Sequence, residues 1–243
     1  MIKAESTEND TSPGKAVYKG SWGVIFDMDG VLIDSYKAHY LSWKRMLGRH
    51  GLDITENQFA STFGRTNQDI LVHLFPFIDV KDYDALAEEK EEIFLEIIRN
   101  DFLEMEGAGE LVSALHEAGA LLAIGSSAPK ENIQTVLEMM PGGEFFGTVT
   151  CGDEITRGKP DPEVFLKTAE KLNLPPQKCI VVEDAPAGVR AGKSAGCGVV
   201  ALAGTVSRDR LLEADLVVDS LRELAPGDFL RLVSLDKRGM VRK

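Results

Sequence analysis

From residue 109 onward, short apolar segments alternate with segments of helical periodicity, and this alternation is the feature that most constrains the fold. Strands that alternate with helices pair in parallel, because each helix provides the crossover connection to the next strand. The strands contain Val, Ile, Leu and Ala with few polar residues, which is typical of a sheet covered by helices on both faces. The alternating segments are helix 109–118, strand 121–125, helix 130–140, strand 148–151, helix 162–172, strand 179–183, helix 187–195, strand 199–202 and strand 216–218. The pattern therefore predicts an α/β fold with a doubly wound parallel sheet.

The first part of the chain has a different pattern, in which one strand is followed only by helices. The apolar run 24–26 predicts the strand, and the helical segments after it are 36–50, 55–61, 67–75 and 82–100. We therefore predict a Rossmann-like α/β core domain of residues 22–36 and 104–243, interrupted by an all-helical cap domain of residues 37–103. Residues 1–21 are polar and without an apolar segment, which predicts a mobile N-terminal extension.

The formal charge of the chain is −12, from 27 basic and 39 acidic residues among 243. This charge argues against a protein that binds nucleic acid or anionic membranes by bulk electrostatics. No apolar run of the sequence approaches the ~20 residues that span a bilayer. Three cysteines without a CxxC spacing predict buried thiols in a reducing compartment. We therefore expect a cytoplasmic protein, a monomer or a weak homo-oligomer, without nucleic-acid or membrane partners.

Polar side chains follow several of the predicted strands at the point where each strand ends. They are Asp27 and Asp29 after the first strand, Ser126 and Ser127 after the second, Lys159 in a later loop, and Glu183 and Asp184 at the end of strand 179–183. Ligands of open α/β sheets bind beyond the carboxyl ends of the strands, so we expect these side chains to converge. Clustered carboxylates repel one another unless a cation joins them, and oxygen ligands without His or Cys favour Mg²⁺. The pattern therefore predicts a magnesium site at this edge.

The same residues, in their order and spacing, resemble the four sequence motifs of the haloacid dehalogenase-like (HAD) superfamily. The motifs are the run Asp27-Met28-Asp29-Gly30-Val31-Leu32-Ile33-Asp34, then Ser126, then Lys159-Pro160, then Glu183-Asp184. The helical segment directly after the first motif is similar to that of the branch containing beta-phosphoglucomutase and related sugar phosphatases. The resemblance covers roughly residues 22–220 and implies an enzyme of phosphoryl transfer.

The resemblance also implies a catalytic role for each residue of the motifs. Asp27 would be the nucleophile that attacks phosphorus, and Asp29 would protonate the leaving alcohol and later deprotonate the attacking water. Ser126 would give its hydroxyl and backbone N–H to the phosphoryl oxygens. Lys159 would neutralise charge between the nucleophile and the phosphoryl group.

The metal ligands implied by the resemblance come from two of these strand ends. Mg²⁺ would bind the carboxylates of Asp27 and Asp184 and the backbone carbonyl of Asp29. Glu183 would reach the metal through a water molecule.

In this branch the helical cap closes over the site and contributes substrate contacts. His39 and Trp43 are four residues apart on one helix face and so either both face the cleft or form a satisfied histidine beside a core tryptophan. Lys90 is the charged member of a helical stripe that consists of Leu86, Lys90, Ile93, Phe94 and Ile97. His39 and Lys90 match positions that resemble the mutase's cap residues for gating and proton transfer. The predicted substrate contacts are His39, Trp43, Arg65, Thr66, Asn67, Lys90 and Ser127.

The predicted substrate loop, residues 63–67, is where the sequence departs from the mutase pattern. At the position of Asn67 the mutase carries an arginine that holds the second phosphate, and after Ser126 it carries polar residues where this chain has Ala128-Pro129. A mutase holds a bisphosphate at both ends, so these differences favour hydrolysis. Arg65 or Lys130 as a substitute phosphate ligand keeps a mutase open.

The sequence therefore predicts a Mg²⁺-dependent phosphatase that hydrolyses a small phosphorylated metabolite, a sugar or polyol phosphate, through an aspartyl-phosphate intermediate. The alternative is a phosphosugar mutase of the beta-phosphoglucomutase type. A dehalogenase has no use for Asp29, Asp184 or Mg²⁺, and both residues argue against it. A non-catalytic binding protein with this fold is less favoured, because all the core catalytic positions are present.

Overall fold

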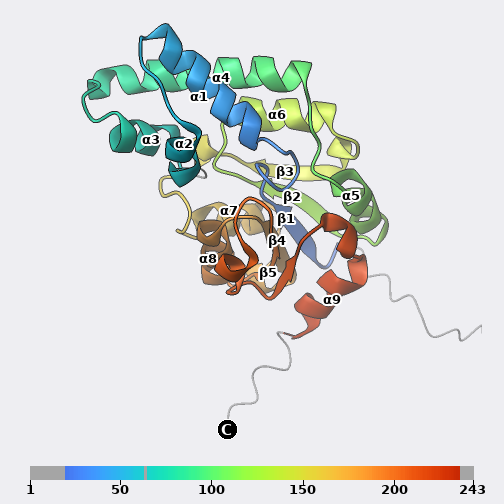
Figure 1. Ribbon diagram of the computed structural model, residues 1–243. Helices are drawn as coiled ribbons and strands as arrows, with labels where there is room; N and C mark the ends of the chain where they lie inside the picture. Colours follow the sequence, from blue (N-terminus) through green and yellow to red (C-terminus); the bar gives the residue numbers. More distant parts are fainter. Residues whose placement is uncertain (1–19, 63–64, 236–243) are drawn as a thin grey trace, which may run out of the picture.

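The computed structural model describes residues 20–62 and 65–235, so most of the predicted N-terminal extension, residues 1–19, lies outside the described residues. Figure 1 shows one sheet with helices on both faces and a separate group of helices, α1 to α4, above one edge of it. Within the described ranges, no helix combines the length and the apolar character that a membrane span needs.

The sheet has six strands, and every neighbouring pair is parallel. In the order β3-β2-β1-β4-β5-β6, the first strand of the chain lies at the centre, with later strands added on either side of it. This order is that of a doubly wound sheet, which confirms the predicted fold class. The strands are β1 (Gly23–Phe26), β2 (Leu121–Gly125), β3 (Phe146–Thr150), β4 (Cys179–Glu183), β5 (Gly198–Leu202) and β6 (Leu216–Val218).

Each face of the sheet has its own hydrophobic core, because side chains alternate between the faces along a strand. Val24 and Phe26 of β1 pack into one core, and Ile25 between them packs into the other. The first core is covered by α5 (Ala108–Glu117), α6 (Lys130–Met139) and α9 (Pro226–Leu235). The second core is covered by α7 (Glu163–Lys171) and α8 (Pro186–Ala195).

The helices between β1 and α5 form what we call the helical insert, residues 36–100. They are α1 (Tyr36–Arg49), α2 (Glu56–Thr62), α3 (Asn67–Leu74) and α4 (Tyr83–Asn100). Trp43, Phe59 and Ile93 from three of these helices meet in a hydrophobic cluster that is separate from the two cores of the sheet. The insert therefore has a core of its own.

Two adjacent backbone segments connect the insert to the sheet. The N–H of Asp34 donates to the carbonyl of Leu103 (2.9 Å), and the N–H of Met105 donates to the carbonyl of Leu32 (3.0 Å). Ile33 and Glu104 form an isolated antiparallel bridge between them. The chain therefore leaves and re-enters the core at one place.

Most polar residues of the motifs lie at the ends of β1, β2 and β4, the central strands of the sheet, and Lys159 lies in the segment between β3 and α7. Strands added after β1 extend the sheet first on the β2 side and then on the β4 side. A crevice forms at such a change of direction, at the carboxyl ends of the strands. The fold therefore places the motif residues where doubly wound proteins bind ligands.

Candidate active site

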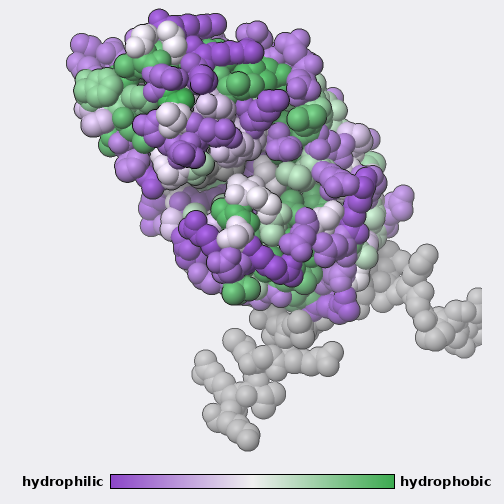
Figure 2. Space-filling view, viewed as in Figure 1, coloured by the Kyte–Doolittle hydropathy of each residue, from purple (hydrophilic) through white to green (hydrophobic). Residues whose placement is uncertain are grey.

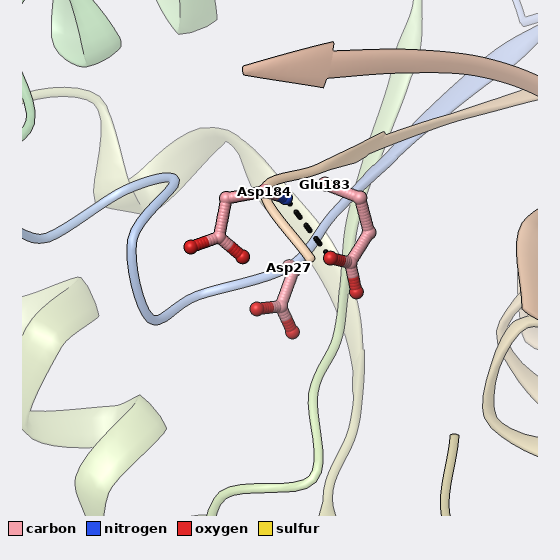
Figure 3. Close-up of side chains that lie close together, drawn as sticks. All are labelled: Asp27, Glu183 and Asp184. Carbon is pink, nitrogen blue, oxygen red and sulfur yellow. Dashed lines mark hydrogen bonds between the residues drawn. The ribbon is translucent and has the colours of Figure 1, made fainter. Parts of the chain in front are cut away.

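Three carboxyl groups meet at the carboxyl ends of β1 and β4. Asp27, Glu183 and Asp184 are all buried, and each offers an oxygen atom within 4.8 Å of the other two (Figure 3). Gly30, in the loop after β1, has a φ of +75°, and a Cβ atom there would overlap with the carboxylate of Asp184. A glycine is therefore needed for this loop to approach β4 so closely.

Lys159 bridges two of these carboxylates. Its Nζ atom donates to Asp27 Oδ1 at 2.6 Å and to Glu183 Oε1 at 2.7 Å. The other oxygen of Glu183, Oε2, accepts hydrogen bonds from the backbone N–H groups of Asp184 (2.9 Å) and Ala185 (3.0 Å). Glu183 thus fixes both the lysine and the turn that carries Asp184.

Burial and mutual repulsion shift the titration of these groups. Burial raises the pKa of Asp27 to about 7, the charge of Lys159 opposes this rise, and the charges of Glu183 and Asp29 add to it. The pKa of Asp184 is also raised well above its usual value, by burial and then by the charges of Glu183 and Asp27. Burial lowers the pKa of Lys159, but the two carboxylates beside it outweigh burial and raise that pKa overall. Lys159 therefore remains charged.

The donor set fits a divalent cation. Three buried carboxyl groups face the single ammonium group of Lys159, so ionisation of all three leaves an excess of negative charge that is costly to bury. Asp184 Oδ2 is buried and has no hydrogen-bond partner among the described residues. Carboxylate oxygens are the ligands that hard cations such as Mg²⁺ prefer. The residues present therefore suit a metal ion of this kind.

Ser126 follows β2 at the same edge and is buried. Its hydroxyl oxygen accepts a hydrogen bond from the N–H of Ala128 (3.1 Å), which leaves the hydroxyl hydrogen free to be donated. Its own N–H donates to the carbonyl of Thr150 on β3 (3.1 Å). The prediction that this N–H binds phosphoryl oxygens is therefore corrected, because the pairing of β2 with β3 already uses it.

Asp29 is linked to the insert through His39 of α1. The His39 Nε2 atom lies 3.0 Å from Asp29 Oδ1, and the Nδ1 atom lies 2.8 Å from Lys90 Nζ. An ammonium group can only donate, so Nδ1 accepts from Lys90 and the ring donates to Asp29 through Nε2. The ring of Phe94 stacks on His39 with centroids 4.0 Å apart. Lys90 and Phe94 together therefore orient His39.

The environment of Asp29 favours its ionised form. Burial raises the pKa of Asp29, but the interactions with His39, the nearby hydroxyl of Ser35 and the charge of Lys90 outweigh burial and lower that pKa overall. The two aspartates of the first motif thus differ: the pKa of Asp27 is raised and that of Asp29 is lowered.

A cleft of about 1020 Å³ opens beside these residues, between the insert and the core. Figure 2 shows the surface hollowed between the two parts. Arg65, Thr66 and Ser127, three of the predicted substrate contacts, line this cleft together with Lys159. Thr66 also caps α3, since its hydroxyl oxygen accepts from the N–H of Asp69. Residues 63 and 64 of the predicted substrate loop lie outside the described residues.

Other predicted substrate contacts lie away from the cleft. Trp43 is 1% exposed and belongs to the hydrophobic cluster of the insert, so the prediction that it contacts substrate is corrected. The side chain of Asn67 donates to Glu91 Oε1 at 2.7 Å. His39 and Lys90 are not among the residues that line the cleft. His39 contacts Asp29, and Lys90 contacts His39. Equal spacing on a helix face does not separate a cleft-facing side chain from a core one.

The structure also brings to the site residues that the sequence analysis did not single out. Arg190 of α8 and Arg210 line the cleft, and Glu91 of α4 contacts Asn67 and Lys90. Glu91 stands in a run of charged residues, and nothing in that run distinguishes it from its exposed neighbours. The arginines come from helical segments whose exposed positions carry no motif. These three residues therefore had no usable signal in the sequence.

Comparisons with known proteins agree with this geometry. The family model for haloacid dehalogenase-like hydrolases matches residues 24–202. Hexitol phosphatase A of Escherichia coli is 36% identical over 205 residues, which cover 83% of this chain and 92% of that protein. A phosphorylated carbohydrates phosphatase of Thermotoga maritima is 32% identical over 71% of this chain and 81% of that protein.

A solved structure gives the same result at the level of the fold. The beta-phosphoglucomutase of Clostridium difficile superposes with a TM-score of 0.78 at 27% identity, over 89% of this chain and 98% of that one. The extent of the family match and the similarity to these proteins lead to one conclusion. The chain belongs to the haloacid dehalogenase-like hydrolases.

Proposed function

We propose that this protein is a phosphatase that hydrolyses the phosphate monoester of a sugar or polyol, with Mg²⁺ as its cofactor. The observation that carries the proposal is the buried group of Asp27, Glu183 and Asp184 around the ammonium of Lys159, at the edge of a cleft. The similarity to hexitol phosphatase A supports both the reaction and the substrate class.

In the proposed reaction Asp27 is the nucleophile. Its carboxylate attacks phosphorus, and the bond between phosphorus and the ester oxygen breaks. Asp29 must enter this step protonated, against the preference of the free site for its ionised form, and it gives that proton to the departing alcohol. Asp29 then takes a proton from a water molecule, which attacks the phosphorus of the aspartyl phosphate and restores Asp27. Lys159 lies 2.6 Å from Asp27 and holds positive charge at the nucleophile throughout. The hydroxyl of Ser126 donates to a phosphoryl oxygen.

Asp27, Asp184 and the backbone carbonyl of Asp29 would hold the metal ion, and Glu183 would reach it through water. When bound, Mg²⁺ supplies positive charge that weakens the repulsion between the anionic nucleophile and the anionic phosphate. The same charge would favour the ionised form of Asp27, whose pKa burial raises.

We also propose that residues 37–103 act as a cap domain that selects the substrate, on the core formed by residues 22–36 and 104–243. The cleft between the two parts is lined by Arg65, Thr66 and Ser127, which offer hydrogen bonds to a polyhydroxylated molecule. A cytoplasmic location without nucleic-acid or membrane partners stays a prediction, as does the monomeric or weakly associating state.

A phosphosugar mutase is the second candidate, and the fold similarity to beta-phosphoglucomutase favours it. The same aspartyl phosphate would then be returned to a sugar hydroxyl instead of to water. Asn67 argues against this reaction, because its amide nitrogen is engaged by Glu91 and offers no charge for a second phosphate.

Phosphorus NMR of the protein with Mg²⁺ and a panel of sugar and polyol phosphates distinguishes the two. The panel includes beta-glucose 1-phosphate with a trace of glucose 1,6-bisphosphate. Growth of the inorganic phosphate signal is the expected result and also ranks the substrates. Conversion of the 1-phosphate into a 6-phosphate without release of phosphate would establish the mutase instead.

A further inference from the structure

Glu91 is a nearly buried carboxylate of the insert that has no role in the proposed reaction. Its side chain is 14% exposed, and its Oε1 atom accepts from Lys90 Nζ (2.8 Å) and from Asn67 Nδ2 (2.7 Å). Its Oε2 atom accepts from Asn132 Nδ2 at 2.7 Å. Burial raises the pKa of Glu91, but the charges of Lys90 and His39 and these hydrogen bonds outweigh burial and lower it. Glu91 is therefore held as an anion.

Asn132 lies on the other side of the boundary, in the first turn of core helix α6. It is 1% exposed, and its carbonyl oxygen has no hydrogen-bond partner among the described residues. A buried amide with an unmatched polar atom stabilises a core less than an apolar side chain of the same size. The contribution of Asn132 therefore lies in its bond to Glu91 and not in packing.

This bond joins helix α4 to the core directly beside Lys90. Lys90 precedes Glu91 on α4, and it donates to His39, which in turn donates to Asp29. Arg99 of α4 also contacts α6, at Glu131 (3.5 Å), where both side chains are more than half exposed and ion pairs contribute little, and at Thr135 (3.4 Å). Apolar side chains of α4 (Phe94, Leu95 and Ile98) pack in the same core as Ile133 and Val136 of α6. The bond between Glu91 and Asn132 is the hydrogen bond between the two helices that lies next to Lys90, so it bears most directly on the position of His39.

We propose that Glu91 and Asn132 are positioning residues, whose hydrogen bond holds the insert against the core in the arrangement that directs His39 toward Asp29. The contacts of Glu91 with Lys90 and Asn132, and of Lys90 with His39, are the route by which the pair acts. The kinetic test of this pair rests on the proposed phosphatase activity. The second test is hydrogen exchange in the free protein, which is independent of that activity.

The first variant is Asn132→Leu, which keeps the size of the side chain and removes both polar atoms. We expect kcat to fall about tenfold or more, the order of one hydrogen bond to a charged group, with a smaller change in KM. The midpoint of thermal unfolding should change little, because the removal of a buried unmatched oxygen offsets the loss of the partner of Glu91 Oε2. Hydrogen exchange of α4 should become faster in the free protein.

The second variant, Glu91→Gln, lies in the insert and leaves the core helix unchanged. Its amide nitrogen can donate to the oxygen of Asn132 if that amide turns over, so the bridge changes from a bond to a charged group into a weaker bond between two neutral amides. We expect a smaller fall in kcat and a smaller rise in the exchange of α4 than in Asn132→Leu. The double variant should be no worse than the poorer single one, because both act on one interaction.

Glu89→Gln is the matched control on the same helix. Glu89 pairs with Arg49 (2.9 Å) and His50 (2.7 Å) and so connects α4 to α1 within the insert, without contact to the core. Its loss should leave kcat and KM unchanged.

Wild-type kcat and wild-type exchange of α4 in both variants would overturn the proposal. A loss of activity that follows a fall in the unfolding midpoint, with α4 exchange unchanged relative to the rest of the chain, would overturn it too. If Asn132→Leu does not fold, Glu91→Gln decides alone. If the wild-type protein hydrolyses no phosphate ester, the proposed function fails, and exchange in the free protein still decides whether the pair holds the insert.

Discussion

Asp27 and Asp29 are two residues apart, and their surroundings shift their pKa values in opposite directions. The pKa of Asp27 is raised to about 7 by burial, while His39, Ser35 and Lys90 lower the pKa of Asp29. The ammonium of Lys159 lies within 2.7 Å of oxygens on both Asp27 and Glu183. A bound cation and Lys159 would together keep Asp27 ionised, as a nucleophile requires.

Replacing Asp27 by asparagine tests its role as nucleophile. The amide that replaces the carboxylate lacks an anionic oxygen, so phosphate release should fall by roughly a thousandfold or more. The fold should survive, since one of three mutually repelling buried carboxylates is removed and Lys159 keeps Glu183 as a partner. Phosphate release and thermal unfolding of Asp27→Asn measure the two effects. Normal turnover would exclude Asp27 as the nucleophile.

A second prediction concerns Glu163, which anchors the loop before Lys159. It accepts from the hydroxyl of Thr156 (2.9 Å) and the N–H of Arg157 (2.9 Å), and it pairs with Lys167 (2.7 Å). These contacts, the bond from Lys167 first, lower the pKa of Glu163 from 4.5 to about 2. The stability from this group is therefore complete above pH 4.5 and is lost as the pH falls toward 2.

Urea unfolding of the wild type and of Glu163→Gln between about pH 6 and pH 2.5 measures this contribution. The wild type should be the more stable at the upper end of this range, and the difference should shrink toward the lower end as Glu163 becomes protonated. A difference that is independent of pH would contradict the lowered pKa.

At the scale of elements, Gly30 shows why a loop and not a strand decides the geometry of the site. Its φ of +75° lies in the left-handed region, and the loop passes so near β4 that a Cβ atom would meet the Asp184 carboxylate. Strands β1 and β4 hold Asp27 and Asp184 in neighbouring positions through their parallel pairing, of which Phe26 opposite Val182 is the last pair. The loop then brings Asp29 back over them.

Gly30→Ala should therefore disrupt the site more than the fold. Strain from the positive φ costs about 1–2 kcal/mol, and displacement of Asp184 should lower phosphate release by roughly tenfold or more, as measured in the same assay. Gly48→Ala is the control, because a Cβ atom in helix α1 meets nothing within 4 Å and should raise stability by about 0.5–1 kcal/mol. Unchanged turnover in Gly30→Ala would show that the close approach is not needed.

The elements of the sheet could largely be predicted from the sequence, and the reasons lie in particular residues. The apolar run of β4 matches the predicted strand 179–183 because both of its faces are buried. Strand β3 begins at Phe146, before the predicted start at residue 148, because it is a half-buried edge strand with a shifted register beside β2. Helix α9 was not predicted, although Phe229 and Val233 carry helical spacing after Pro226.

The motif residues of the site were also accessible from the sequence, and the network around Glu91 was not. Asp27, Ser126 and Glu183 stand at the carboxyl ends of strands, so topology alone brings them to one edge. Glu91 and Asn132 are 41 residues apart on two helices whose relative position no local pattern describes. Contacts across the boundary between insert and core thus depend on packing that the sequence does not display.

At the scale of the whole molecule, an acidic chain must attract an anionic substrate. The formal charge is −12, whereas the cleft is lined by four basic residues (Arg65, Lys159, Arg190 and Arg210) and four acidic ones (Asp34, Asp69, Glu106 and Asp219). The lining of the cleft is thus less negative than the chain as a whole, but its side chains do not add up to a positive charge. A divalent cation at the carboxylates would supply the positive charge that draws an anion there.

Binding of Mg²⁺ should therefore stabilise the whole fold, because the ion joins residues from β1 and β4. At a hundred times its dissociation constant a ligand adds about 2.7 kcal/mol, which for a chain of this size raises the unfolding midpoint by roughly 5–10 °C. Asp184→Asn should remove most of that rise, whereas Asp209→Asn, at an exposed position, should retain it. Thermal unfolding with Mg²⁺ and after chelation measures both, and an unchanged midpoint in the wild type would argue against a metal site.

The paired connections at Asp34–Leu103 and Leu32–Met105 have a consequence for how such enzymes diversify. Because both ends of the insert leave the core side by side, the insert is a module that can be exchanged without cutting the sheet or moving Asp27. With the substrate-selecting role proposed for the insert, selection can then alter the choice of substrate in one module while the chemistry stays intact in the other. Grafting residues 36–100 onto a related core is the corresponding route for engineering a new specificity.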